Sequence, residues 1–143
     1  MHSHAAVAVL VVLVAGCGGG LSKDELVAKG DTICKRVNTR MAKEPDPQSA
    51  TDLERLAKRT VQISDPAIAD MKALDPPSEL ESDFKKFVAS LKRQRDLTKE
   101  IGDAAAAGDT ARIQKVSAGA QKDENEYRRL AGKIGFKECG GGV

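Results

Sequence analysis

Apolar residues recur every three or four positions through most of the chain after residue 22. This spacing places them on one face of an α-helix. The pattern predicts four helices, at about residues 22–43, 49–75, 78–107 and 109–135. Short connections that contain proline or glycine join them, which favours antiparallel neighbours. The sequence therefore predicts an all-α fold, an up-down-up-down four-helix bundle.

Local signals refine the ends of these helices. The segments 22–25 and 78–81 both begin with serine and end with glutamate, the capping box that closes a helix N-terminus. Pro66 lies inside the second helix, where it removes one backbone hydrogen bond. We therefore expect the second helix to be kinked near Pro66, or broken there, with Asp65 capping a new helix that starts at Pro66.

The beginning of the chain has a different pattern. Residues 1–16 contain no Lys, Arg, Asp or Glu, and residues 5–15 form an uninterrupted apolar run. Such a run is typical of a signal peptide and is shorter than the roughly 20 residues that span a bilayer as a helix. It ends in Val14-Ala15-Gly16-Cys17, the lipobox pattern, in which the chain is cut before the cysteine and lipid is attached to its thiol. The alternative is an ordinary secretory signal in which Cys17 is incidental.

One feature departs from the usual signal-peptide pattern, because only His2 and His4 stand where Lys or Arg is expected. The sequence divides into a signal peptide at 1–16, a Gly-rich tether at 17–21, a four-helix bundle at 22–139 and a flexible tail at 140–143. Two or more acyl chains hold a protein stably at a membrane. We expect an exported protein, anchored to the outer face of the cell membrane through Cys17.

Charge and composition exclude several classes of function. The chain has 23 basic and 21 acidic residues, a balance that gives no reason to expect nucleic acid as a partner. Both histidines lie in the signal peptide, so the mature chain has none. A His-based catalytic triad, a His-ligated haem and a Glu-x-x-His di-iron site are thereby excluded. We expect no enzymatic activity, no cofactor and no metal site.

Lipidation of Cys17 leaves Cys34 and Cys139 as a pair. An even pair of cysteines in an exported protein predicts a disulfide, because the compartment is oxidising. The bond would close a loop that spans nearly the whole bundle. In the chain-entropy model, closing a loop of about 100 residues stabilises the folded protein by up to ~4.7 kcal/mol. Two free thiols, or a pair that binds a soft metal, are the alternatives.

Polar residues interrupt the apolar stripes at one level of the predicted bundle. Gln94 and Asp123 lie about equally far along the chain from the turn at 108–109, and Arg59 or Thr60 falls near that level on the second helix. One interpretation is a polar ligand site inside the bundle. The other is a hydrogen-bonded layer that fixes the register of the helices, or side chains that reach outward to water.

The third helix also carries basic residues on one face, with Lys85, Lys92 and Lys99 seven positions apart. On a membrane-tethered protein, such a face suits anionic headgroups or an acidic envelope polymer. Acidic residues are interleaved on the same helix, so an ordinary solvated face is the alternative.

The landmarks that carry a family resemblance span most of the chain: Val14-Ala15-Gly16-Cys17, Leu21 to Glu25, Asp31 to Cys34, Leu74-Asp75-Pro76-Pro77, Gly108-Asp109 and Cys139-Gly140. Together they resemble a family of small, uncharacterised bacterial lipoproteins of high-GC Gram-positive lineages. The resemblance implies a disulfide-linked helical bundle outside the cytoplasmic membrane. It implies no activity and no site.

The sequence thus favours a lipid-anchored envelope protein with a non-enzymatic interaction or structural role, whose partner is an envelope protein or an anionic polymer. Its contact with the membrane is the lipid on Cys17. The alternative function is a helical bundle that binds a small ligand or a metal at the polar layer formed by Arg59, Thr60, Gln94 and Asp123.

Replacing Cys17 tests the anchor. We expect Cys17→Ser to release the protein from membranes, or to leave it as an uncleaved precursor, because serine has no thiol to carry the lipid. Cell fractionation and the intact mass of the protein measure these outcomes. Unchanged processing together with unchanged membrane association would contradict lipidation.

Overall fold

The computed structural model describes residues 19–140, and every regular element in this range is helical. Four α-helices follow one another: α1 (Lys23–Met41), α2 (Ala50–Lys72), α3 (Glu81–Ala106) and α4 (Thr110–Ile134). A short 3₁₀ turn, η1 (Ser78–Leu80), precedes α3. The predicted all-α four-helix fold is confirmed.

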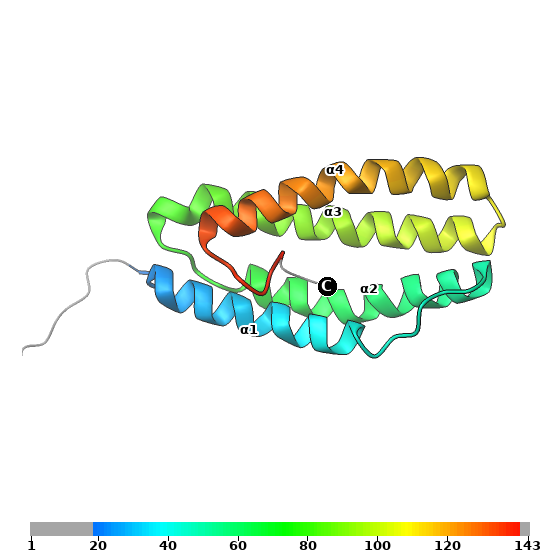
Figure 1. Ribbon diagram of the computed structural model, residues 1–143. Coiled ribbons are helices and arrows are strands. Elements are labelled where there is room, and N and C mark those ends of the chain that lie inside the picture. Colours follow the sequence, from blue (N-terminus) through cyan, green and yellow to red (C-terminus); the bar gives the residue numbers. More distant parts are fainter. Residues whose placement is uncertain (1–18, 141–143) are drawn as a thin grey trace, which may run out of the picture.

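The helices run alternately up and down (Figure 1), and α3 packs along both α2 and α4. Helix α1 packs chiefly on α2. It has 19 residues, whereas the other three have 23, 26 and 25. Figure 1 shows α2, α3 and α4 extending beyond its end. The bundle therefore consists of four helices at one end and of three helices at the other.

Capping residues close the helices at two predicted places. The Ser22 hydroxyl accepts the Glu25 backbone N–H at 3.2 Å, while the Glu25 carboxylate accepts the Ser22 backbone N–H at 2.8 Å. The α3–α4 turn has Gly108 at a φ of 66°, and the Asp109 carboxylate accepts the Arg112 backbone N–H at 3.0 Å. These bonds satisfy backbone donors that the first turn of a helix leaves free.

The second predicted capping box, at residues 78–81, is wrong. The Leu80 N–H donates to the Pro77 carbonyl at 2.9 Å, which tightens these residues into η1, and no side chain caps α3. Proline fixes φ near the value that a tight turn needs. The two prolines before Ser78 therefore favour the 3₁₀ turn over a capped α-helix.

Helix α2 continues through Pro66, so the separate helix at Asp65-Pro66 does not form. Proline has no N–H, and the carbonyl of Gln62 loses its helical partner. Both Gln62 and Pro66 lie on the exposed side of α2. Water can reach the free carbonyl there, which explains why the helix tolerates this proline.

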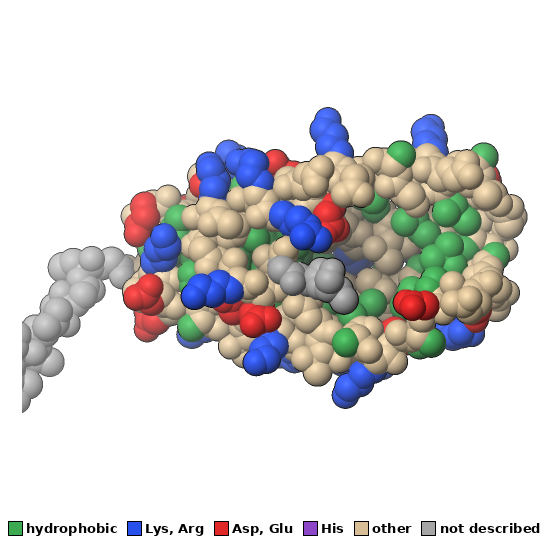
Figure 2. Space-filling view, in the orientation of Figure 1, with side chains coloured by type: hydrophobic (Ala, Val, Ile, Leu, Met, Phe, Trp, Pro, Cys, Tyr) green, Lys and Arg blue, Asp and Glu red, His purple; other side chains and the backbone are tan. Residues whose placement is uncertain are grey.

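The apolar core is concentrated where α1 is present. Its fully buried side chains there include Leu26, Met71, Phe87, Leu130 and Ile134. Beyond the end of α1, several apolar side chains of the other helices are only half-buried, namely Leu53, Leu56, Leu97, Ile101 and Ile113. Figure 2 shows this end of the molecule hollowed, with apolar side chains in the hollow.

After α4 the chain turns back and runs between α4 and α1 (Figure 1). Gly135 makes the turn with a φ of 102°. The buried ring of Phe136 then packs on α1 at Gly30, so closely that a Cβ at Gly30 would lie 2.3 Å from Phe136 Cε1. Only glycine leaves room for this ring on the surface of α1.

Hydrogen bonds and one covalent bond fix this C-terminal segment on α1. The Asp31 carboxylate accepts the backbone N–H groups of Lys137 and Glu138, each at 2.9 Å. Cys139 forms a disulfide with Cys34, and the two Cα atoms lie 5.2 Å apart. The predicted disulfide is confirmed, and it joins residues 105 positions apart in the sequence.

Several predictions concern residues outside the described range, namely the signal peptide at 1–16, Cys17 with the start of its tether, and residues 141–143. Within the described range, no helix has the length and apolar character needed to cross a membrane. The Leu21 N–H donates to the Asp75 carbonyl at 2.8 Å, which attaches Leu21 to the segment that follows α2.

The contact between Gly30 and Phe136 can be tested by adding one methyl group. We expect Gly30→Ala to lower the free energy of unfolding by roughly 1–3 kcal/mol, because the methyl group would overlap the ring. Gly119→Ala is the matched control in α4, where an added Cβ meets nothing within 4 Å. It should raise the free energy of unfolding by about 0.5–1 kcal/mol.

Denaturant unfolding of the two variants measures this difference. Equal effects of the two substitutions would show that Gly30 is not a position of close packing.

Candidate functional site

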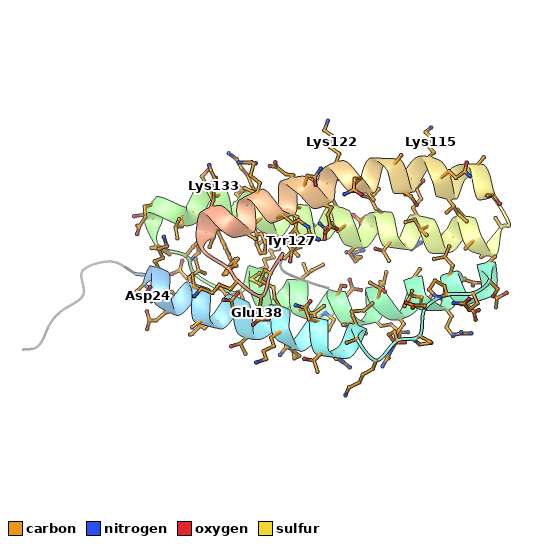
Figure 3. All side chains as sticks on the ribbon, in the orientation of Figure 1. Asp24, Lys115, Lys122, Tyr127, Lys133 and Glu138 are labelled. Atoms are coloured by element: carbon orange, nitrogen blue, oxygen red, sulfur yellow. A yellow bond between two sulfur atoms is a disulfide. The ribbon has the colours of Figure 1, made fainter. Side chains whose placement is uncertain are left out.

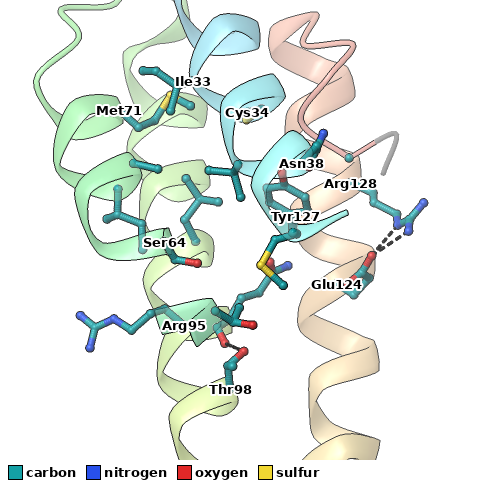
Figure 4. A pocket seen from close by; sticks show the side chains of 18 residues that line it. Ile33, Cys34, Asn38, Ser64, Met71, Arg95, Thr98, Glu124, Tyr127 and Arg128 are labelled. Carbon is teal, nitrogen blue, oxygen red and sulfur yellow. Dashed lines mark hydrogen bonds and ion pairs between the residues drawn. The ribbon is translucent and has the colours of Figure 1, made fainter. Parts of the chain in front are cut away.

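A cavity of about 250 Å³ lies inside the bundle, near the end of the C-terminal segment (Figure 4). All four helices and Gly140 contribute to its wall, and the cavity is partly open to solvent. Its apolar wall consists of Ile33, Val37, Met41, Ala67, Ile68, Met71 and Leu91. Concave, mostly apolar spaces of this kind are where proteins bind small molecules.

The cavity follows from the way the C-terminal segment fills the space between α1 and α4. Near the start of α1, the Phe136 ring occupies this space, and the Cys34–Cys139 bond lies next to it. Further along, the small side chains of Ser64 and Ala67 form part of the wall on α2, beside Thr60, Ile68 and Met71. Small side chains fill less of the interior of a bundle than large ones do, which leaves room for a cavity.

Two buried polar atoms in the wall have no hydrogen-bond partner, Gln94 Nε2 and Arg95 Nε, and of these two Arg95 Nε belongs to an ion pair. Gln94 Nε2 is buried, and no protein atom accepts its N–H groups. The two threonines of the wall are satisfied, since Thr60 Oγ1 donates to the Leu56 carbonyl at 2.8 Å and Thr98 Oγ1 donates to the Gln94 carbonyl at 2.9 Å. A buried donor without a partner costs roughly 1–3 kcal/mol. A bound molecule that accepts from Gln94 would remove this cost.

The charged groups around the cavity are paired. Glu124 and Arg128 form an ion pair at 2.7 Å, marked in Figure 4. Arg95 Nη1 lies 2.9 Å from Asp96 Oδ1, and Arg95 Nε lies 3.1 Å from Asp65 Oδ1. Arg95 Nε and Asp65 Oδ1 are close enough to form an ion pair, but they are not aligned for a hydrogen bond. Figure 4 shows the Arg95 guanidinium turned away from the cavity.

Tyr127 connects the cavity with the aromatic part of the core. Its ring stacks on Phe87, with 5.3 Å between the ring centroids. Figure 3 shows it on the inner side of α4, whereas Lys115 and Lys122 extend outward from the same helix. Burial raises the pKa of Tyr127 to about 12, and the nearby Glu124 carboxylate acts in the same direction. The cavity wall therefore contains a neutral phenol.

Of the four residues predicted to form a polar layer, the structure brings Thr60 and Gln94 to the cavity wall. The other two form ion pairs at the surface instead, Arg59 with Glu44 at 2.9 Å and Asp123 with Arg93 at 3.3 Å. Successive residues of a helix point about 100° apart. Thr60 therefore faces inward where Arg59 faces outward, and Glu124 reaches the wall in place of Asp123.

The sequence pattern identifies Tyr127 only as a member of the apolar stripe of the fourth helix, and it does not identify Glu124 or Arg128 as part of a site. A signal was present in their spacing. Residues 124, 127 and 128 are three and four positions apart, so their side chains share one helix face. A tyrosine next to an ion pair on an otherwise apolar face marks a place where the core meets water.

The three lysines of the predicted basic face of α3 lie outside the cavity wall. Lys85 and Lys92 are exposed, and Lys99 pairs with Asp103 at 2.8 Å. Among residues 19–140, no group of three or more His, Cys, Asp or Glu side chains could hold a metal ion.

Comparisons with protein-family profiles, with curated proteins and with solved structures find no match to this chain. The function of the cavity therefore has to be inferred from its own geometry. That geometry offers an apolar space, one free amide donor and paired charges.

The titration of Tyr127 tests how deeply this side chain is buried. Because the chain has one Tyr and no Trp, the absorbance of tyrosinate reports Tyr127 alone. We expect a midpoint near pH 12 in the folded protein and, in denaturant, near the ordinary value of about 10. A folded midpoint near the ordinary value would contradict the burial.

The sign of the stability effect follows from the raised pKa. The unfolded chain loses the Tyr127 proton at lower pH than the folded protein does. The stabilisation from this group is therefore complete below a pH of about 10 and is lost as the pH rises towards the folded value.

Proposed function

We propose that this protein is a non-enzymatic binding protein of the bacterial envelope, held at the outer face of the membrane by lipid on Cys17. We further propose that the cavity binds a small molecule. The apolar run and the lipobox of residues 1–17 support export and lipidation. The bond between Cys34 and Cys139 supports export as well, because disulfides persist in oxidising compartments.

The observation that carries the binding function is an apolar cavity with a free amide donor in its wall. The cavity volume is about 250 Å³. It exceeds the roughly 150 Å³ that holds one benzene molecule, and it approaches the range of ligand pockets, which begins near 300 Å³. A purely structural polar layer would give Gln94 a partner inside the bundle, whereas its Nε2 has none. A bound molecule accounts better for this amide.

The groups around the cavity suit binding better than catalysis. A general acid or base works best when its pKa lies near the operating pH. The mature chain has no histidine, and the Tyr127 phenol, with a pKa of about 12, is too weak an acid for this role. The Glu124 carboxylate is held in its ion pair with Arg128.

The lipid would hold the start of α1 close to the membrane. Helix α1 begins a few residues after Cys17. The four-helix end of the bundle would then lie near the membrane, and the three-helix end would point away from it. The cavity, between these ends, would remain open to the envelope.

The hollow at the three-helix end favours a second function, the docking of an envelope protein. Leu53, Ile101 and Ile113, on α2, α3 and α4, are only half-buried. Figure 2 shows apolar side chains in the hollow at this end. Apolar side chains gathered in an open hollow mark interaction sites. Such a surface suits a protein partner better than it suits an anionic polymer.

Two alanines of α2 provide a test of the cavity. Ala67 is buried in the wall, whereas Ala69 is exposed on the same helix. We expect Ala67→Leu to fill the cavity and to reduce the amount of any co-purifying small molecule at least about tenfold, the loss expected for ~1.4 kcal/mol of binding free energy. Ala69→Leu adds the same side chain outside the cavity and should leave that amount unchanged.

The measurement is mass spectrometry of organic extracts from the mature protein and both variants, each purified from the cell envelope. Extracts that are alike in all three proteins, or that hold no small molecule in any of them, would contradict a binding function for the cavity.

A further inference from the structure

We infer that the ligand is an uncharged amphipathic molecule, with an apolar body of about ten non-hydrogen atoms and one oxygen that accepts a hydrogen bond. This chemistry rests on the proposed binding function and specifies what the cavity selects. Three features of the wall determine it: the volume, the free amide and the pairing of every charged side chain.

The volume sets the size of the ligand. An apolar cavity of about 150 Å³ holds benzene, which has six non-hydrogen atoms. At the same ratio, the volume of about 250 Å³ holds about ten such atoms. Met41 and Met71 line the space, and their flexible thioether side chains adapt to ligands of different shape. The apolar body therefore need not be rigid.

The free amide sets the polar group of the ligand. Gln94 Nε2 can only donate, so its partner has to be an acceptor, such as a ketone, ester, ether or hydroxyl oxygen. The threonine hydroxyls of the wall already donate to backbone carbonyls. Gln94 Nε2 is therefore the one buried donor of the wall that has neither a hydrogen-bond partner nor an ion pair. A single accepting oxygen on the ligand satisfies it.

The paired charges exclude an ionic ligand. Arg128 is compensated by Glu124, and Arg95 is compensated by two aspartates. A carboxylate or phosphate that entered the apolar space would lose its hydration without gaining a free cation. A neutral molecule pays no such desolvation penalty.

Two probes of nearly equal size separate these possibilities. Methyl heptyl ketone is neutral and has one accepting oxygen, whereas nonanoate is an anion with a similar alkyl chain. Each is titrated near neutral pH into the oxidised mature chain carrying Cys17→Ser, which avoids detergent. The fluorescence of Tyr127 reports binding, because this residue lines the cavity and the chain has no other tyrosine and no tryptophan. We expect the ketone to bind at least about tenfold more tightly than nonanoate.

A variant of the amide identifies the polar contact. We expect Gln94→Leu to weaken binding of the ketone about tenfold, because the donor is lost while the apolar wall remains. Gln114→Leu, at an exposed position of α4 outside the cavity wall, should leave the affinity unchanged. Far-UV circular dichroism and the intact mass of each oxidised variant establish that the fold and the disulfide are retained.

Nonanoate binding as tightly as the ketone, or an unchanged ketone affinity in Gln94→Leu, would overturn the inferred ligand chemistry while leaving the binding cavity in place. Failure of both probes to bind would overturn the inference as well. If, in addition, Ala67→Leu leaves the organic extracts unchanged, the proposed binding function is contradicted as well.

Discussion

The covalent bond between Cys34 and Cys139 holds the C-terminal segment in the space between α1 and α4. Helix α1 packs chiefly on α2, so the bundle would be open between α1 and α4 without this segment. Phe136 closes part of the opening by packing on Gly30. The remaining space, near Gly140, is the cavity. The same bond therefore determines how the core closes and how much room it leaves.

The helices could be predicted because local rules fix them. Apolar spacing locates all four, the Ser22 capping box starts α1, and Gly108 with Asp109 forms the α3–α4 turn. The pattern at 78–81 meets the same capping rule, but the prolines before it impose a 3₁₀ turn. The contact of Phe136 with Gly30 could not be predicted, since it depends on where the C-terminal segment crosses α1.

The sequence predicts how far along the bundle the site lies, but it does not predict which residue of α4 faces inward there. Distance along the chain placed Gln94 and Thr60 at one height, and both line the cavity. Whether Asp123 or its neighbour Glu124 faces inward depends on how α4 rotates against α3, which packing decides. The missing partner of Gln94 Nε2 is a property of the assembled wall, and no local pattern reports it.

Met41 and Met71, the two methionines among residues 19–140, both line the cavity, from α1 and α2. Nuclear magnetic resonance of isotope-labelled methionine methyl groups therefore gives one signal from each side of the space. When methyl heptyl ketone is added, we predict that both signals shift and that the shifts saturate together. Two signals that stay fixed as the ketone concentration rises would contradict a ligand site inside this bundle.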